Sequence, residues 1–361
     1  MRYRNWVIAV SVALCGVGRL GADDAVAAIE KLGGQVLQDG RQVSLRGAEV
    51  TDADLKVLAP FKGLTSLTLN DTGVTDAGLK QLAPLKGLTF LSLSGSKVTD
   101  AGLKQLAPLK GLIYLALGRT EITDGGLKEL AQLKELKTLL LDGTGVTDAG
   151  VKELAQLKGL KMLILPETGV TDSGLKELAK LTQLIHLNLG GTRVTDAGMK
   201  ELAQLMGLIS LHLEDTKITD VGIKELTRIK GLQTLDLDGT QVTDASFKEF
   251  ARLERLGVLK LNRTKVTGVG SKALAPLEQL IYLHLGETGA TDAGIKELSQ
   301  IKTLTFLNLT GTKVTDVGIK ELAALTKLHS LYLTGTDVTD AGVKDIEKAL
   351  PKCQVVRETK P

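Results

Sequence analysis

The chain has 361 residues, of which only 3% are aromatic, and 45 basic residues face 42 acidic ones for a formal net charge of +3. The three arginines among residues 1–22 account for that excess, so the rest of the chain is neutral, which argues against nucleic acid as a partner because its binding depends on neutralising phosphates. Leucines that recur at a fixed interval in so aromatic-poor a chain indicate a repeat array and exclude two ordinary globular domains.

Residues 1–22 are predicted to be an export signal peptide. Two arginines in the first four residues precede the apolar residues 6–14, a run too short to cross a bilayer of ~30 Å. Cleavage is expected near Cys15 or after Ala22, and a short buried helix and a lipid-anchored Cys15 are the alternatives. We therefore expect the chain to act in the periplasm, on the cell surface or as a secreted protein, with no membrane span after cleavage and no disulfide framework.

Residues 23–63 are predicted to form an N-terminal cap and a first partial repeat. The segment "ADDAVAAIEKLGG" is typical of a helix, and "QVLQDGRQVSL" is typical of a β-hairpin that turns at Asp39-Gly40. Such a cap is needed because the terminal units of a repeat array must cover an exposed end of the core.

Residues 64–338 are predicted to be the array itself, in 24-residue units of the form L-x-x-L-x-L-x-x-T-x-V-T-D-A-G-L-K-x-L-A-x-L-x-x. Leu67 and Leu69 alternate with polar residues, as in a strand with one buried side. Leu79 and Leu82 have helical spacing. Each unit is therefore predicted to be one short strand followed by one short helix.

The junction between strand and helix predicts how each helix begins. Thr75 fits the N-cap, and Asp76 fits the first turn, where the helix dipole favours a negative charge. Val74 and Leu79 are spaced as a hydrophobic staple, and Asp76 and Lys80 as an ion pair. This lysine recurs thirteen times with acids interleaved, so we expect a solvated outer face and treat a polyanion-binding strip as the alternative.

A strand, a helix and a further parallel strand form a right-handed coil. Strands stack ~4.8 Å apart and helices ~8–10 Å, so an α/β solenoid should curve, with its parallel strands on the concave side and its helices on the convex side. Thr72 and its equivalents are expected to satisfy turn backbone groups as a hydroxyl ladder. Residues 339–361 should close the array with a capping helix and a short strand.

The motif LxxLxLxxTxVTDAGLKxLA resembles the leucine-rich repeat of the ribonuclease-inhibitor-like kind, from residue 40 to about residue 355. It is similar to repeat proteins that some bacteria encode in large numbers and to the repeat region of F-box ubiquitin-ligase subunits, except that Thr replaces the usual Asn of the turn. The resemblance implies a horseshoe that binds proteins or other ligands on its concave face. An F-box-like adaptor role rests on resemblance alone and would not suit an exported chain.

The binding site is expected where the strands vary between units. The third and fifth residues of each unit lie between the leucines and should point away from the core, in two rows across the sheet. The candidate partner-binding residues in these rows are Phe90, Tyr114, Leu140, Met162, Ile164, His186, His212, Asp236, Lys260, Tyr282, His284, Phe306, Asn308 and Tyr332.

The apolar members of the two rows are expected to form one exposed surface that contacts a partner, although they could simply cover one another. His212, Asp236, Lys260 and His284 occupy consecutive strands, so their charges should interact. Asp236 should stay ionised and should favour a charged His212, which would make affinity depend on pH. A polar stripe that keeps the sheet soluble is the alternative.

These features favour a non-catalytic binding module, with a structural envelope protein that lacks a discrete site as the alternative. No metal site is expected, because His212 and His284 are three strands apart. Ser210, His212 and Asp236 include the residue types of a catalytic triad, but their spacing offers no oxyanion hole, so no catalytic residue is predicted. No cofactor is expected, since the glycines follow the repeat and form no phosphate-binding motif.

One unit departs from the pattern. In "TKVTGVGSKALAPL", Gly268 replaces the first-turn aspartate and Ser271 replaces a core leucine. The preceding unit carries Phe247 at the position equivalent to Ser271, together with Phe250. We expect a weakened helix in this unit, with Phe247 filling the space that Ser271 leaves.

Overall fold

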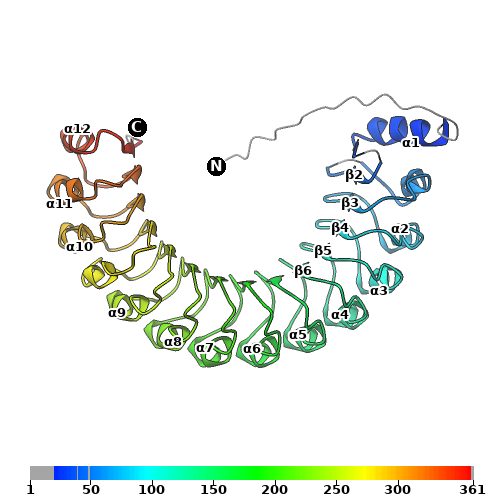
Figure 1. Cartoon of the computed structure of the whole chain (residues 1–361), viewed down its shortest axis with the longest axis horizontal. Helices are drawn as coiled ribbons and strands as arrows, with labels where there is room; N and C mark the ends of the chain where they lie inside the picture. Colours follow the sequence, from blue (N-terminus) through cyan, green and yellow to red (C-terminus); the bar gives the residue numbers. More distant parts are fainter. Residues whose placement is uncertain (1–19, 39, 48, 359–361) are drawn as a thin grey trace.

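The computed structural model describes residues 20–38, 40–47 and 49–358, which form an open, curved solenoid (Figure 1). A fifteen-stranded sheet follows the chain order along the inside of the curve, and the helices line the outside. The predicted α/β horseshoe with concave strands and convex helices is therefore confirmed. Most of the predicted signal peptide, Cys15 included, lies outside the described residues, and residues 20–22 begin helix α1 (Leu20–Lys31).

The sheet begins with β1 (Gln35–Leu37) and β2 (Gln42–Ser44), which pair antiparallel as the predicted hairpin requires; Asp39 of its turn lies outside the described residues. From β2 onward all neighbouring strands are parallel. They are β3 (Ser66–Thr68), β4 (Phe90–Ser92), β5 (Tyr114–Ala116), β6 (Thr138–Leu140), β7 (Met162–Ile164), β8 (His186–Asn188), β9 (Ser210–His212), β10 (Thr234–Asp236), β11 (Val258–Lys260), β12 (Tyr282–His284), β13 (Phe306–Asn308), β14 (Ser330–Tyr332) and β15 (Gln354–Val356).

The outer layer consists of short helices, one or two in each unit. The α-helices after α1 are α2 (Asp76–Leu79), α3 (Asp100–Leu103), α4 (Asp124–Leu130), α5 (Asp148–Leu154), α6 (Asp172–Leu178), α7 (Asp196–Leu202), α8 (Asp220–Leu226), α9 (Phe247–Phe250), α10 (Asp292–Leu298), α11 (Asp316–Glu321) and α12 (Asp340–Ala349). The 3-10 helices are η1 (Asp54–Leu58), η2 (Lys104–Leu106), η3 (Asp244–Ser246), η4 (Ser271–Leu274) and η5 (Leu322–Ala324). Within the described residues, none of these helices is long and apolar enough to cross a membrane.

A single hydrophobic core runs the length of the solenoid between the strands and the helices. Leu67 and Leu69 of the first full unit are completely buried, as are Leu79 and Leu82 of its helical part. One unit cannot enclose its own leucines, so neighbouring units bury them for one another, and the whole array shares one core.

The helix starts show how adjacent units are joined. Thr75 caps α2 as predicted, because its hydroxyl accepts the backbone N–H of Ala77 at 3.2 Å. The carboxylate of Asp76 reaches the next unit, where it accepts the backbone N–H of Thr99 at 2.8 Å and its hydroxyl at 2.7 Å. This aspartate–threonine link between units occurs eleven times along the array.

Two local predictions are corrected by this arrangement. In the described part of the chain, Asp76 and Lys80 form no ion pair, because the aspartate points toward the next unit. Lys80 and its equivalents are exposed, as a solvated outer face requires. Thr72 does satisfy a turn group, but its hydroxyl donates to the carbonyl of Leu69 in its own unit at 2.8 Å, so no ladder between units is formed.

The unusual unit is distorted at the expected place. Gly268 and Gly270 have φ values of +87° and +90°, and the helix of this unit is the 3-10 helix η4 instead of an α-helix. Phe247 of the preceding unit is 1% exposed, and a ring carbon lies 3.8 Å from where a Cβ on Gly270 would stand. Ser271 is fully buried, and among the described residues its hydroxyl has no hydrogen-bond partner.

Candidate functional site

The concave side of the sheet presents the two predicted rows in register. Each row residue lies opposite its equivalent on the next strand, so that Asp236 pairs with His212 on one side and Lys260 on the other. The leucines between the rows are buried, whereas most row side chains are half-buried; Tyr282, at 40%, is the most exposed of the candidate aromatic residues. The alternation of the strands therefore places every candidate residue on one face.

An aromatic pair and three aliphatic side chains form what we term the N-terminal patch. The rings of Phe90 and Tyr114 stack with their centroids 4.2 Å apart and their planes at 11°. Burial, and then the charge of nearby Asp142, raise the pKa of the Tyr114 hydroxyl. Leu140, Met162 and Ile164 continue this patch on the following strands β6 and β7.

A second group, the C-terminal patch, lies on β12, β13 and β14. The ring centroid of Phe306 is 5.6 Å from that of Tyr282, 5.2 Å from that of Tyr332 and 4.7 Å from that of His284. Strands β8 to β11 separate the two patches and carry mostly polar residues at the row positions. The apolar residues thus form two patches and not the single surface that the sequence led us to expect.

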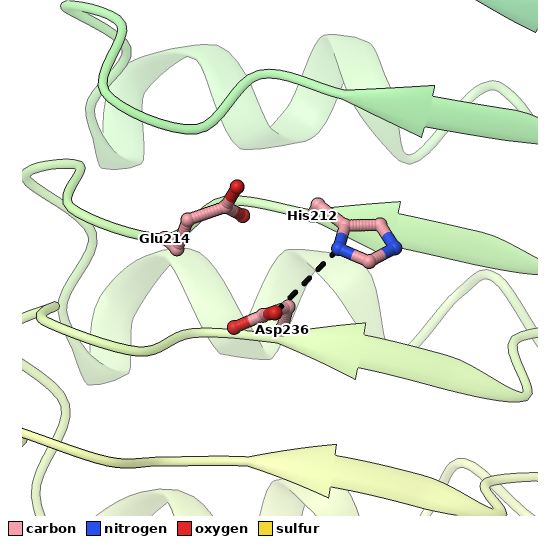
Figure 2. Close-up of side chains that lie close together, drawn as sticks. All are labelled: His212, Glu214 and Asp236. Carbon is pink, nitrogen blue, oxygen red and sulfur yellow. Dashed lines mark ion pairs between the residues drawn. The ribbon is translucent and has the colours of Figure 1, made fainter. Parts of the chain in front are cut away.

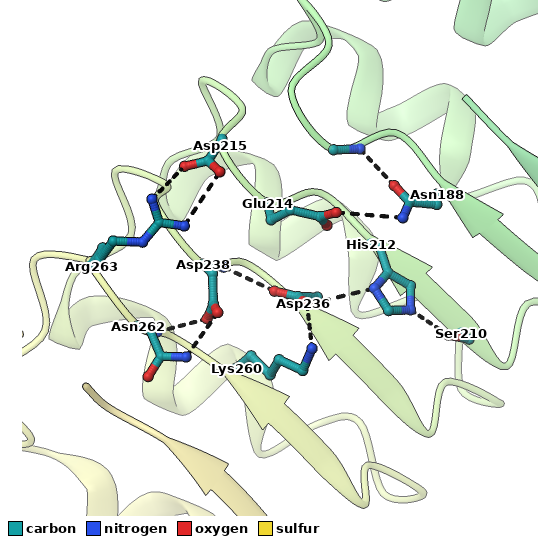
Figure 3. Close-up of polar contacts among 11 residues, drawn as sticks. Asn188, Ser210, His212, Glu214, Asp215, Asp236, Asp238, Lys260, Asn262 and Arg263 are labelled. Atoms are coloured by element: carbon teal, nitrogen blue, oxygen red, sulfur yellow. Dashed lines mark hydrogen bonds and ion pairs between the residues drawn. The ribbon is translucent and has the colours of Figure 1, made fainter. Parts of the chain in front are cut away.

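Asp236 is the centre of the polar cluster between the patches (Figure 3). Its side chain is only 6% exposed; Oδ2 accepts from Lys260 Nζ at 2.7 Å and lies 3.5 Å from His212 Nδ1. Burial alone would raise the pKa of Asp236, but the contacts with His212 and Lys260 and the charge of Lys260 outweigh it and lower the pKa to about 2. Asp236 is therefore ionised, as predicted.

The imidazole of His212 is held from both sides. Ser210 Oγ lies 3.0 Å from Nε2, while Nδ1 faces Asp236. This is the contact order of a catalytic triad, but Ser210 lies in a regular strand whose neighbours pair with it on both sides, and its own N–H donates to the carbonyl of Ile185. These contacts hold the imidazole of His212 between a hydroxyl and a carboxylate.

His284 does not continue the charged row. Burial and the positive charge of Lys260 lower the pKa of His284 to about 4, so its imidazole is neutral near neutral pH. Its ring packs against Phe306 in the C-terminal patch. The interacting charges that were expected to run from His212 to His284 therefore end at Lys260.

A third row contributes to the polar cluster and was missed in the sequence analysis. Asp238 accepts the backbone N–H and the side-chain amide of Asn262, both at 2.8 Å, and burial raises the pKa of Asp238. Glu214 Oε1 lies 3.4 Å from the amide nitrogen of Asn188. Glu214 and Asp238 each follow the second leucine of their strand. Continuing the alternation of concave-facing residues by one more position would have identified them.

The remaining two candidates lie beside the cluster. Asn308 uses its side-chain oxygen to accept the backbone N–H of Thr310 at 2.9 Å, and its amide nitrogen is 3.4 Å from Asn262 Oδ1. His186 is half-buried on β8, and among the described residues it takes part in none of the cluster's hydrogen bonds or ion pairs.

Three potential metal ligands meet at the centre of the concave face. His212, Glu214 and Asp236 each offer one donor atom, and these atoms lie within 4.8 Å of one another (Figure 2). We expected no metal site because His212 and His284 are three strands apart. They lie on β9 and β12, too far apart to bind the same ion. A glutamate two residues after His212 was not considered.

Comparisons with known proteins agree with this architecture. A family model described as "Leucine Rich repeat" matches residues 88–107, 180–203, 300–323 and 324–346. No curated protein matches the chain.

Among solved structures, an internalin of Listeria monocytogenes is similar at 24% identity and a TM-score of 0.68, over 89% of this chain and 87% of that one. A leucine-rich-repeat protein of Leptospira interrogans is similar at 28% identity and a TM-score of 0.66, over 83% and 74%. A chain from the octameric complex of Latrophilin 3, Unc5D and FLRT2 is similar at 17% identity and a TM-score of 0.53, over 76% and 84%.

Proposed function

Because the chain is a leucine-rich-repeat protein, we propose that it acts as a non-catalytic binding module whose concave face holds a protein partner outside the cytoplasm. Repeats of this kind are typical of protein-binding modules. One observation carries the assignment of the face. The convex side repeats the same exposed lysine in every unit, whereas the concave rows change from unit to unit and gather aromatic side chains into two patches.

The two patches have the chemistry of interface anchors. Tyrosine and phenylalanine provide large contact areas at low cost in side-chain entropy, and such residues dominate binding energy at interfaces. Tyr282 is 40% exposed and Tyr332 and Phe306 are half-buried beside it, so a partner can still cover them. The polar cluster between the patches would fix the orientation of a partner, because its buried charges demand complementary groups.

Export is supported by residues 1–22, with their basic start and short apolar run. The chain would then meet its partner in the periplasm, at the cell surface or in the medium. The fold is compatible with this role, since the complex of Latrophilin 3, Unc5D and FLRT2 contains a leucine-rich-repeat component.

A pull-down from the extracytoplasmic fraction tests the proposal. The variant Tyr282→Ala/Phe306→Ala removes two anchors of the C-terminal patch, and Lys296→Ala/Lys320→Ala makes an equal number of changes on the convex side. We expect the first variant to lose the partner and the second to retain it. If both variants retain every bound protein, or if the wild type binds none, a structural envelope protein without a discrete site becomes the better account.

A further inference from the structure

The polar cluster contains one group that its internal contacts do not satisfy. Glu214 Oε2 is buried and has no hydrogen-bond partner among the described residues, although Oε1 lies near the amide of Asn188. A buried carboxylate oxygen without a partner is costly, and it calls for a cation or a donor that the protein itself does not supply. The neighbours of Glu214 in this cluster are the imidazole of His212 and the carboxylate of Asp236.

The imidazole is already oriented as metal ligands usually are. Its Nε2 lies 3.0 Å from Ser210 Oγ, and its Nδ1 lies 3.5 Å from Asp236 Oδ2. In the tautomer whose Nε2 carries the proton and donates it to the serine, Nδ1 is the nitrogen that can bind an ion shared with Asp236. A metal-bound histidine generally gives its second ring nitrogen to such an outer partner. Ser210 thereby fixes the ring, and a bound ion would take the place of the direct contact between Nδ1 and Asp236.

The separation of the donors suits a tetrahedral ion. Zinc–ligand distances of ~2.0–2.1 Å place neighbouring ligands of a tetrahedron ~3.3–3.4 Å apart. His212 Nδ1 and Asp236 Oδ2 are 3.5 Å apart, and one donor atom from each of the three side chains lies within 4.8 Å of the other two. A change in the flexible side chain of Glu214 would close the remaining gap, since the other two ligands are fixed by their strands.

The charge balance also favours a cation. The three carboxylates of Glu214, Asp236 and Asp238 share this part of the sheet, and Lys260 is the base that contacts Asp236. The nearby Arg263 is directed toward Asp215, at 3.1 Å. Lys260 acts as the resident counter-ion, and its side chain is 32% exposed, so it can turn toward solvent when a second cation arrives.

From this arrangement we propose that His212, Glu214 and Asp236 form a binding site for a divalent transition-metal ion, with Zn²⁺ the best match, on the concave face. One imidazole and two carboxylates are ligands that zinc accepts, whereas Ca²⁺ and Mg²⁺ prefer sites made of oxygen alone. Three protein ligands leave a fourth position for water or for a side chain of a bound partner. The site does not depend on the proposed protein binding.

Calorimetric titration of the chelator-treated full chain with ZnCl₂ tests the site, with Co²⁺ absorption as a report on tetrahedral coordination. We expect one equivalent of Zn²⁺ per chain, lost in Glu214→Gln and in His212→Gln. Ser210→Ala should weaken binding by about 10- to 100-fold, the usual effect of removing an outer partner of a metal-bound histidine. Lys260→Met should tighten binding, because the competing cation is gone.

The matched control is Asp215→Asn, which removes a neighbouring exposed acid that is paired with Arg263 and is not a proposed ligand. It should bind Zn²⁺ as the wild type does. Glu214→Gln keeps the shape of the side chain, and circular dichroism will show that both ligand variants fold. The site is refuted if the wild type binds no Zn²⁺, or if folded Glu214→Gln and His212→Gln bind it as tightly as the wild type.

Discussion

His284 and Asp236 show how position within one sheet sets the charge of a residue. Both lie in the same row on the concave face and both are close to Lys260. Burial and then the ammonium group of Lys260 lower the pKa of His284. The pKa of Asp236 falls because its contacts with His212 and Lys260 outweigh its burial. The spacing in the sequence predicted the contact between these charges, but not the burial that leaves His284 neutral.

We expect His284 to make stability depend on pH. The unfolded chain takes up a proton near the ordinary histidine pKa of 6.5, whereas the folded chain does so only near pH 4. The folded state therefore loses stability relative to the unfolded one as the pH falls through this interval. Asp236, with a pKa of about 2, stays ionised in the folded chain throughout this window, and its own contribution to stability begins to fall only at the acid end, where the unfolded carboxyl protonates around its ordinary pKa of 3.8.

Urea unfolding of the wild type and of His284→Gln, at several pH values between about 7 and 4, measures this contribution. The wild type should lose more stability on acidification than the variant, since other acids titrate equally in both. Parallel pH profiles for the two proteins would show that His284 is not held neutral by the fold.

Glu214 marks a limit of prediction from the repeat pattern. The repeat pattern predicted a strand that ends at its second leucine. In the structure the next residue still faces the concave side, and Glu214 and Asp238 join the polar cluster there. The two-residue alternation of a strand predicts which residues share a face, and it predicted most of the residues on the concave face. The number of residues over which that alternation continues could not be predicted, because it depends on the backbone path of the turn that follows the strand.

The recurring threonine and aspartate of each unit act between elements. The cap by Thr75 was predictable because it is local, within two residues. The link from Asp76 to Thr99 was not, because it spans 23 residues and arises only when units stack. It shows why the motif keeps an aspartate in place of any other acid or helix former: a short carboxylate reaches both donors of the next threonine.

Asp148→Ala tests this link in a regular unit. Asp148 accepts the N–H of Thr171 at 2.8 Å and its hydroxyl at 2.6 Å, so its loss leaves a partly buried donor without a partner. We expect a loss of about 1–3 kcal/mol in the free energy of unfolding. Glu254→Ala, a change of an exposed acid, should cost well under that; equal costs for the two variants would argue against the link.

The helix after β11 is a weak point of the array. Gly268 has no carboxylate, and among the described residues Thr291 accordingly has neither an aspartate partner nor a side-chain cap on α10. The backbone N–H of Thr291 makes only a long contact of 3.4 Å with the carbonyl of Thr267. The series of aspartate–threonine links between the described units is thus interrupted between the unit of Gly268 and the next one, beside the strands of the C-terminal patch.

We expect Phe247 to compensate for part of this defect. We expect Phe247→Ala to cost more than Leu175→Ala in a regular unit, toward the upper part of the ~3–5 kcal/mol range for a buried phenylalanine, because it removes a large, fully buried ring next to a unit whose equivalent side chain is the small Ser271. Denaturant unfolding of the two variants measures the difference.

Hydrogen exchange locates the same weakness directly. Exchange should be fastest, among the interior helices, around Gly268 to Leu274, since local opening follows the weakest contacts. Uniform protection across all interior helices would show that the unit from Leu256 is no weaker than its neighbours.

At the scale of the whole molecule, the curved sheet turns a repetitive chain into a surface with three distinct parts. The N-terminal patch, the polar cluster and the C-terminal patch follow one another along the concave face, while the convex face repeats the same exposed lysine in each unit. The leucine period fixed the architecture in advance, but the division of the face into parts depends on contacts between side chains that the period does not encode.

Photo-crosslinking from one unit tests the central claim, that the concave face is the binding surface. A crosslinking amino acid replaces either Tyr282 on β12 or Lys296 on α10, which lie on opposite sides of the same unit. With the extracytoplasmic fraction as the source of partners, position 282 should give a discrete crosslinked protein and position 296 should not. Crosslinks from position 296 alone, or from neither position, would contradict the account.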